Sequence, residues 1–239
     1  MGPATEITTS DHVSSAMRWW RDAGVDVMID EQPRSWLTPA VAAPGRPALV
    51  IPVKAEKPKS LDTLVEWLMT SDDFPEVGPV QRRVRPSGDV AGGLMVLTDL
   101  PETADVDSGM LFAGELSPLF EKMLGSLGRD RNSIYLASLS AGRPPSGRLS
   151  ENALKMLSET ARDHVRFIAP KQLWLLGSAA SCAILGMTDV QANGKLHSIN
   201  LNDVMVDVIA TAHPRILTTK DQKQRAWANM QLLIEKDDA

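Results

Sequence analysis

QLWLLGSAASCAILG, at residues 172–186, combines a strand signal and a helix signal. QLWLL is a short apolar run typical of a buried strand, and Gly177 then leads into small and apolar residues typical of a buried helix. The same alternation recurs along the chain, with further apolar runs at LMVLT (94–98), IYLAS (134–138) and VDVIATA (206–212). Strands separated by helices imply right-handed crossovers and a mainly parallel sheet covered on both faces. We therefore predict a three-layer α/β/α sandwich with a four-stranded, mainly parallel sheet over about residues 90–235.

Helical periodicity completes this layout. Helices are expected near 60–69, 114–127, 150–168, 178–185 and 221–235. A further helix is expected at the N-terminus, where Ser10 and Asp11 can cap it and Gly24 can end it. The stretch after it is rich in Pro and Ala and cannot form a regular helix. We predict an N-terminal helical segment (1–38), a Pro/Ala-rich linker (39–59) and an α/β domain (60–239).

Composition excludes several classes of protein. The chain has 239 residues, of which 43% are hydrophobic, so a packed core is expected. The 25 Lys and Arg against 30 Asp and Glu give a net charge of −5, which excludes a globally basic nucleic-acid binder but not a local basic surface. A single cysteine, Cys182, excludes an internal disulfide framework, and we expect it to be a small core residue. The chain has no apolar run long enough to span a membrane and no secretory pattern at its start, so we expect a cytoplasmic protein and a monomer.

The loops after the four predicted strands hold the candidate chemistry, because ligands bind at the carboxyl ends of parallel strands. His213 directly follows an apolar strand, where an imidazole can donate a hydrogen bond to a developing anion; a structural histidine at a corner is the competing interpretation. Asp99 follows another strand, where a carboxylate can orient water or can simply cap a turn. The nearby acids Glu102, Asp105 and Asp107 are expected to be exposed.

Basic residues follow two of the strands. Arg215 and Lys220 lie close after His213, and Arg143 and Arg148 lie in the loop GRPPSGR with no acid nearby in the sequence. Such residues can contact phosphates, although a solvated helix face is the ordinary explanation for a basic cluster. The start of the segment LGSAAS offers backbone N–H groups to a phosphate, but its spacing matches neither a P-loop nor a dinucleotide fingerprint.

From Leu94 onward the order of these pieces resembles the uracil-DNA glycosylase superfamily, and specifically its bacterial family 4 enzymes. The segments that carry the resemblance are TDLPE (98–102), GMLFAG (109–114), LSAGRPPSGR (139–148), APKQLWLLGSAASCAILG (169–186), TAHPRILTT (211–219) and KQRAWANMQLL (223–233). MRWWRDAGVD (17–26) also resembles the opening of some bacterial members. Each motif is weak by itself, whereas their order and spacing together are fairly specific.

The resemblance implies a role for each candidate residue. His213 donates to a base oxygen as the glycosidic bond breaks, and Asp99 positions water and faces the sugar. The base is bound by Phe112, which stacks on it, together with Ser138 and Leu100. DNA is contacted by Arg143, Arg148, Arg215, Lys220 and the wedge residue Leu217. DNA is the implied partner, and no metal or other cofactor is needed.

Departures from the family pattern matter equally. Family 4 enzymes hold an iron–sulfur cluster with four cysteines, whereas Gly142 and Leu157 stand at two of the matching positions here, so we expect no cluster. Asp99 is one methylene shorter than the family's glutamate. Ser138 replaces an asparagine and cannot make the paired contact of an amide to a base edge. These changes leave three functions open: a glycosylase with weakened or altered base specificity, a catalytically degenerate relative that binds DNA or protein, and a nucleotide-binding α/β protein.

Overall fold

The computed structural model describes residues 9–24, 58–74, 77–201 and 204–237. The chain divides into two units, 1–55 and 56–239. In the first, helix α1 (Thr9–Asp22) includes Ser10 and Asp11 within the helix rather than at its cap, and Gly24 adopts the left-handed conformation after it with φ +81°. Most of the predicted linker, 39–59, lies outside the described residues.

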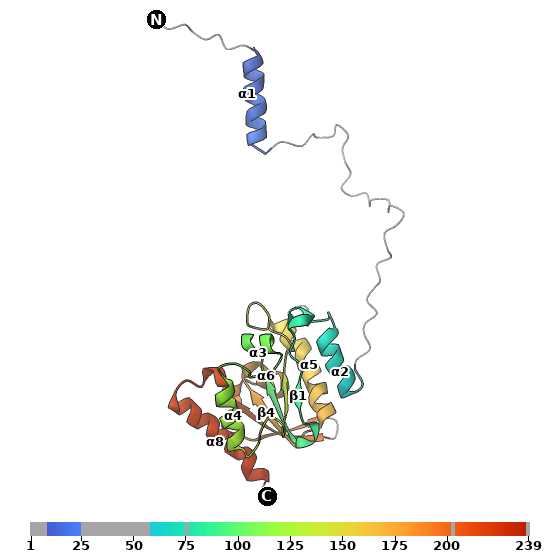
Figure 1. Cartoon of the computed structure of the whole chain (residues 1–239), viewed down its shortest axis with the longest axis vertical. Helices are drawn as coiled ribbons and strands as arrows, with labels where there is room; N and C mark the ends of the chain where they lie inside the picture. Colours follow the sequence, from blue (N-terminus) through green and yellow to red (C-terminus); the bar gives the residue numbers. More distant parts are fainter. Residues whose placement is uncertain (1–8, 25–57, 75–76, 202–203, 238–239) are drawn as a thin grey trace. The chain divides into compact units, whose positions relative to one another are not determined.

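The second unit is built on one six-stranded sheet in the order β1-β3-β2-β4-β6-β5. Figure 1 shows its strands between helices α4 and α8 on one side and helices α2 and α5 on the other. Its four central strands are parallel: β3 (Tyr135–Ser138), β2 (Leu94–Thr98), β4 (Gln172–Leu176) and β6 (Val204–Thr211). These are the four strands predicted from the sequence, and the predicted α/β class is confirmed. The two edge strands β1 (Ser87–Gly88) and β5 (His197–Leu201) are antiparallel to their neighbours. Sequence patterning missed both, because β1 is only two residues long and β5, HSINL, is largely polar.

Helices cover both faces of this sheet. On one face the core includes side chains of α2 (Leu61–Thr70), α5 (Glu151–Ile168), α6 (Ser178–Leu185) and α7 (Asp189–Ala192). On the other face it includes side chains of α4 (Ser117–Ser126) and α8 (Lys220–Asp237). Alternate residues of each strand point to the two faces, so that Met95 and Leu97 belong to the first core and Leu94 and Val96 to the second.

The helices begin and end close to the predicted positions, because their apolar periodicity is strong. Ser150 caps α5 by accepting a hydrogen bond from the Ala153 N–H at 3.2 Å, and Gly186 ends α6 in the left-handed conformation. The short helices α3 (Thr103–Ser108) and α7 were not predicted, since four to six residues carry too little periodicity. Cys182 on α6 is only half-buried, so its predicted core position is wrong. Among the described residues, no helix is both long and apolar enough to cross a membrane.

Candidate functional site

The register of the parallel strands brings four loops to one edge of the sheet. Thr98 of β2 is paired with Ser138 of β3 and with Leu176 of β4, and Leu176 is paired with Thr211 of β6. All four strands therefore end at the same level. The residues that follow them, including Asp99 and His213, lie at one edge, where α/β proteins bind their ligands.

Asp99 is bound to the start of helix α6. Its Oδ1 accepts a hydrogen bond from the Ala180 N–H at 2.7 Å. The helix is preceded by Gly177, which has no side chain to cap it and a φ of +108°. A Cβ at position 177 would lie 2.3 Å from Asp99 Oδ2, so only glycine allows this approach. The carboxylate of Asp99 thus binds the helix N-terminus whose N–H groups the sequence analysis considered for a phosphate.

The same surroundings set the pKa of Asp99. Burial raises this pKa from 3.8 to about 6, while the N–H groups of Ala180 and Ala179 and the charge of Arg215 oppose the rise. Asp99 is therefore mainly ionised at neutral pH. An ionised carboxylate at the sheet edge can orient water or stabilise a developing positive charge.

His213 is a neutral hydrogen-bond donor. Its Nδ1 accepts a hydrogen bond from the Arg215 N–H at 3.1 Å, which leaves the ring proton on Nε2. The residue is 3% exposed, and burial, followed by the charges of Arg215 and Arg143, lowers its pKa from 6.5 to about 3. The backbone thus fixes the tautomer at the start of the turn η4 (Pro214–Ile216), and the ring offers an N–H without a positive charge.

The ring of Phe112 packs close to two other rings. It stacks on Phe120 with centroids 4.2 Å apart, and the His213 ring is 5.7 Å away at an angle of 32°. A flat base between two rings needs roughly 7 Å, which is two contact distances of 3.5 Å. Phe112 is only 1% exposed, so His213 and Phe112 must separate before a base can stack there. In this conformation there is no space for a base beside Phe112.

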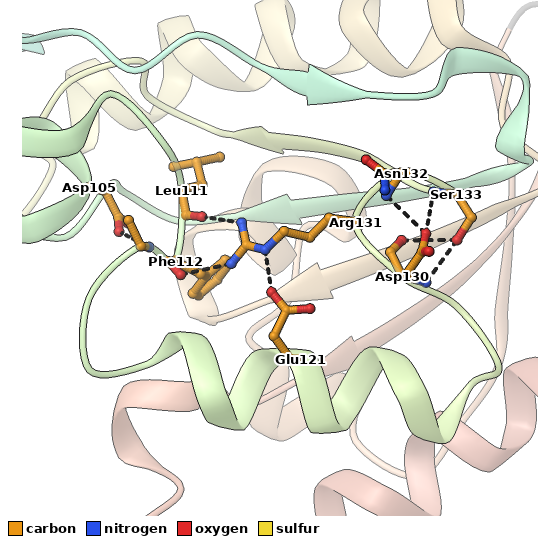
Figure 2. Close-up of polar contacts among 9 residues, drawn as sticks. Asp105, Leu111, Phe112, Glu121, Asp130, Arg131, Asn132 and Ser133 are labelled. Atoms are coloured by element: carbon orange, nitrogen blue, oxygen red, sulfur yellow. Dashed lines mark hydrogen bonds and ion pairs between the residues drawn. The ribbon is translucent and has the colours of Figure 1, made fainter.

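Two charged side chains hold the Phe112 loop (Figure 2). Arg131 donates to the carbonyl oxygens of Leu111 and Phe112, each at 2.7 Å, and also pairs with Glu121 on α4. Asp105 accepts from the N–H groups of Ala113 at 2.8 Å and of Glu102 at 2.9 Å. These contacts hold Phe112 in a left-handed conformation, φ +55°, that is unusual for a bulky residue.

Sequence reasoning missed both of these loop-holding residues. Asp105 was expected to be exposed and is buried. Its position three residues after Glu102 and just before a glycine-flanked aromatic residue was a usable signal, because an acid there can bind the N–H groups of an irregular loop. Arg131 carried no comparable signal, since it reaches the loop from 19 residues further along the chain.

Arg143 and Arg215 share one acidic partner. Arg215 Nη1 lies 2.7 Å from Glu102 Oε1, and Arg143 Nη1 lies 3.3 Å from Glu102 Oε2. The expectation that Arg143 has no acid nearby holds only along the sequence. Arg148 and Lys220, the other predicted phosphate contacts, are exposed.

The remaining candidates are buried. Ser138 and Leu100, assigned to the base pocket, each have less than a tenth of their surface exposed. Leu217, expected to enter DNA, is 4% exposed and packs in the core beside α4 and α8, so it cannot reach DNA as the chain is folded here. Its neighbour Ile216 is 48% exposed.

The residues at the expected cluster positions do not fit an iron–sulfur cluster. A Cβ at position 142 would lie 1.9 Å from the Val77 carbonyl oxygen, so this loop has no room for a cysteine side chain. Leu157 is a core residue with no ligand atom. Within the described part of the chain, no three His, Cys, Asp or Glu side chains gather as a metal site.

Two comparisons bear on this arrangement. The family model described as "Uracil DNA glycosylase superfamily" matches residues 86–233. This range contains all six strands of the sheet, both loop-holding residues and every candidate residue discussed above. No curated protein matches the chain.

Proposed function

Since the chain belongs to the uracil DNA glycosylase superfamily, we propose that it hydrolyses the N-glycosidic bond between a base and deoxyribose in DNA, as in base excision repair. His213 supports this proposal most directly. It is neutral, its Nδ1 is occupied, and its ring lies at the sheet edge with its centroid 5.7 Å from that of Phe112. A preorganised donor of this kind stabilises charge that develops in the transition state without itself having to lose a proton.

In the proposed reaction the target nucleotide is first flipped out of the duplex, at a cost of a few kcal/mol. The bond between the base nitrogen and C1′ then breaks, and its electron pair goes to the base. His213 Nε2–H donates to a base oxygen as this negative charge forms. Asp99 faces the positively charged sugar and orients the water that adds to C1′; the proton released from water leaves with the departing base or to solvent.

Base selection depends on Phe112, Ser138 and Leu100. Phe112 would stack on the base once His213 has moved away from it. The hydroxyl of Ser138 is a single donor and acceptor, whereas an amide can pair with two positions of a base edge. Because discrimination falls when a paired contact is lost, we expect weaker selectivity between uracil and deaminated purines such as hypoxanthine and xanthine.

A degenerate relative that binds DNA without cleaving it is the second candidate. It is favoured by the closed stack of Phe120, Phe112 and His213, which leaves Phe112 1% exposed. The engagement of Asp99 by Ala180 also favours it, since this carboxylate already has a structural task. The two candidates differ in whether the site opens when DNA binds.

Cleavage assays separate the two candidates. Purified protein is incubated with duplex and single-stranded oligonucleotides that carry one uracil, hypoxanthine or xanthine, and abasic product is measured after alkaline cleavage. The double variant Asp99→Asn/His213→Ala, prepared identically, controls for contaminating glycosylases. Product from the wild type but not from this variant supports hydrolysis; equal or no product with all substrates rejects it in favour of the degenerate relative.

A further inference from the structure

Glu102 connects three loops of the carboxyl edge through one side chain. It follows β2, Arg143 follows β3 and Arg215 follows β6, and the two arginines contact separate oxygens of its carboxylate at 3.3 and 2.7 Å. The Glu102 and Arg143 side chains are 21% and 25% exposed, and that of Arg215 is 44% exposed. The triad therefore lies at the surface and is open to exchange with groups from solution.

This triad adjoins the proposed catalytic residues. Arg215 donates its backbone N–H to His213 Nδ1 at 3.1 Å, and Arg143 Nη1 donates to the carbonyl oxygen of Pro101, two residues after Asp99, at 2.9 Å. The charges of both arginines lower the pKa of His213, and that of Arg215 lowers the pKa of Asp99. Beside Arg143 is a cavity of about 350 Å³, which Thr103, Arg82 and Pro144 also line. This cavity therefore adjoins the triad on the side of Arg143.

Two guanidinium groups that converge on one carboxylate are also suited to one phosphate. Arginine binds both groups in the same way, through planar N–H donors directed at two oxygens. The pair of ion contacts is partly exposed, so each contributes little to stability and the carboxylate can be displaced at small cost. A phosphodiester that takes its place would find both donors already directed toward it.

The backbone around the triad stays fixed if the carboxylate leaves. Arg143 Nη1 also donates to the Pro101 carbonyl oxygen at 2.9 Å, which keeps this guanidinium in place without Glu102. The Glu102 N–H is held by Asp105 at 2.9 Å, in the capping box at the start of α3 that the Glu102 side chain completes. The Glu102 side chain therefore has to leave this cap as well as the two arginines, while its backbone N–H stays bound to Asp105.

We propose that Arg143 and Arg215 form the binding site for one phosphodiester of the DNA backbone, and that Glu102 occupies this site in the free protein and is displaced when DNA binds. The site rests on the proposed function for its ligand, DNA, but not on cleavage. It makes Glu102 an internal competitor, so DNA binding to the wild type is weaker than its two arginines would allow.

Glu102→Gln tests the exchange, because glutamine keeps the shape but removes the charge that competes with phosphate. The matched control is Glu66→Gln, which removes the same charge and likewise releases one arginine, Arg85, from an exposed ion pair of 2.7 Å on helix α2. Binding of full-length protein to a labelled duplex without any damaged base is measured by fluorescence anisotropy at two salt concentrations. Thermal unfolding establishes that each variant is folded.

We expect Glu102→Gln to bind about tenfold more tightly than Glu66→Gln at both salt concentrations, with a similar salt slope, because the arginines contact the same phosphate in both complexes. Adding Arg143→Ala or Arg215→Ala to Glu102→Gln should abolish the gain. Equal affinities of Glu102→Gln and Glu66→Gln would overturn the proposal, and so would a lack of DNA binding by every variant at low salt. A gain by Glu102→Gln without base release from any substrate supports this site while rejecting the hydrolase.

Discussion

Two histidines of the domain are buried to nearly the same degree and have lowered pKa values, but they lie in different parts of the fold. His164 on α5 is 2% exposed and shares a hydrogen bond of 2.9 Å with the Tyr135 hydroxyl. Burial lowers its pKa to about 4. His213 is 3% exposed and its pKa is lowered to about 3. His164 lies inside one core layer, whereas His213 lies at the carboxyl edge beside Phe112. Burial and a lowered pKa therefore do not distinguish the two histidines, whereas their places relative to the strand ends do.

The largest effect should come from His213→Ala. Loss of a preorganised donor to a developing anion costs on the order of 100- to 1000-fold in turnover. His164→Gln should leave turnover on the best substrate within about twofold, because glutamine keeps a partner for the Tyr135 hydroxyl. Single-turnover rates of base release measure both. A similar loss in the two variants would break the distinction between the histidines.

His164, which we expect to matter little for turnover, should matter for the free energy of unfolding. His164→Ala leaves the buried Tyr135 hydroxyl without its partner and opens a cavity, which together cost about 3 kcal/mol. Urea unfolding of wild type, His164→Ala and His164→Gln measures this cost. We expect His164→Gln to recover at least half of it, and equal losses in both would attribute the effect to packing alone.

The acid limb of the stability profile should also depend on His164. Its pKa is lowered from 6.5 to about 4 in the folded chain, so the unfolded chain binds the proton first and stability falls as the pH decreases from 6.5 toward 4. At pH 5 this amounts to about 2 kcal/mol. Asp99, whose pKa is raised to about 6, acts in the opposite direction between pH 6 and 4. Urea unfolding at pH 7 and pH 5 should show a loss about 2 kcal/mol smaller for His164→Gln than for the wild type; equal losses would contradict it.

The smallest expected effect concerns the loop that sets Phe112 against His213. Arg131→Gln removes charged donors from the Leu111 and Phe112 carbonyl oxygens and should cost about 1 to 2 kcal/mol of stability. It should also raise KM more than it lowers kcat, because in the proposed reaction Phe112 would bind the base and would not react. Arg129→Gln on the same turn serves as the control for charge. A change in kcat alone would argue against this positioning role.

Local pattern was sufficient for much of the fold. The runs at 94–98 and 172–176 match β2 and β4 residue for residue, because a buried parallel strand is a continuous apolar run between turn residues. The position of Asp99 and His213 at strand ends followed from the same pattern. β1 and β5 were not predictable, since edge strands need no apolar run.

Partners distant in sequence were decided only by the folded chain. Asp99 meets Ala180 across 81 residues, and Glu102 meets Arg215 across 113. The family resemblance implied that Leu217 contacts DNA, whereas packing against α4 and α8 buries it and leaves Ile216 exposed.

The sequence by itself therefore determined the layers, the four central strands and the edge that holds the candidate chemistry, because these follow from hydrophobic periodicity over a few residues. Only the tertiary structure decided that Asp99 caps a helix, that Phe112 is covered by His213, and that Glu102 lies between two arginines. Each of these depends on which loops the folded sheet brings within a few ångströms of one another, and short-range periodicity contains no information about that distance.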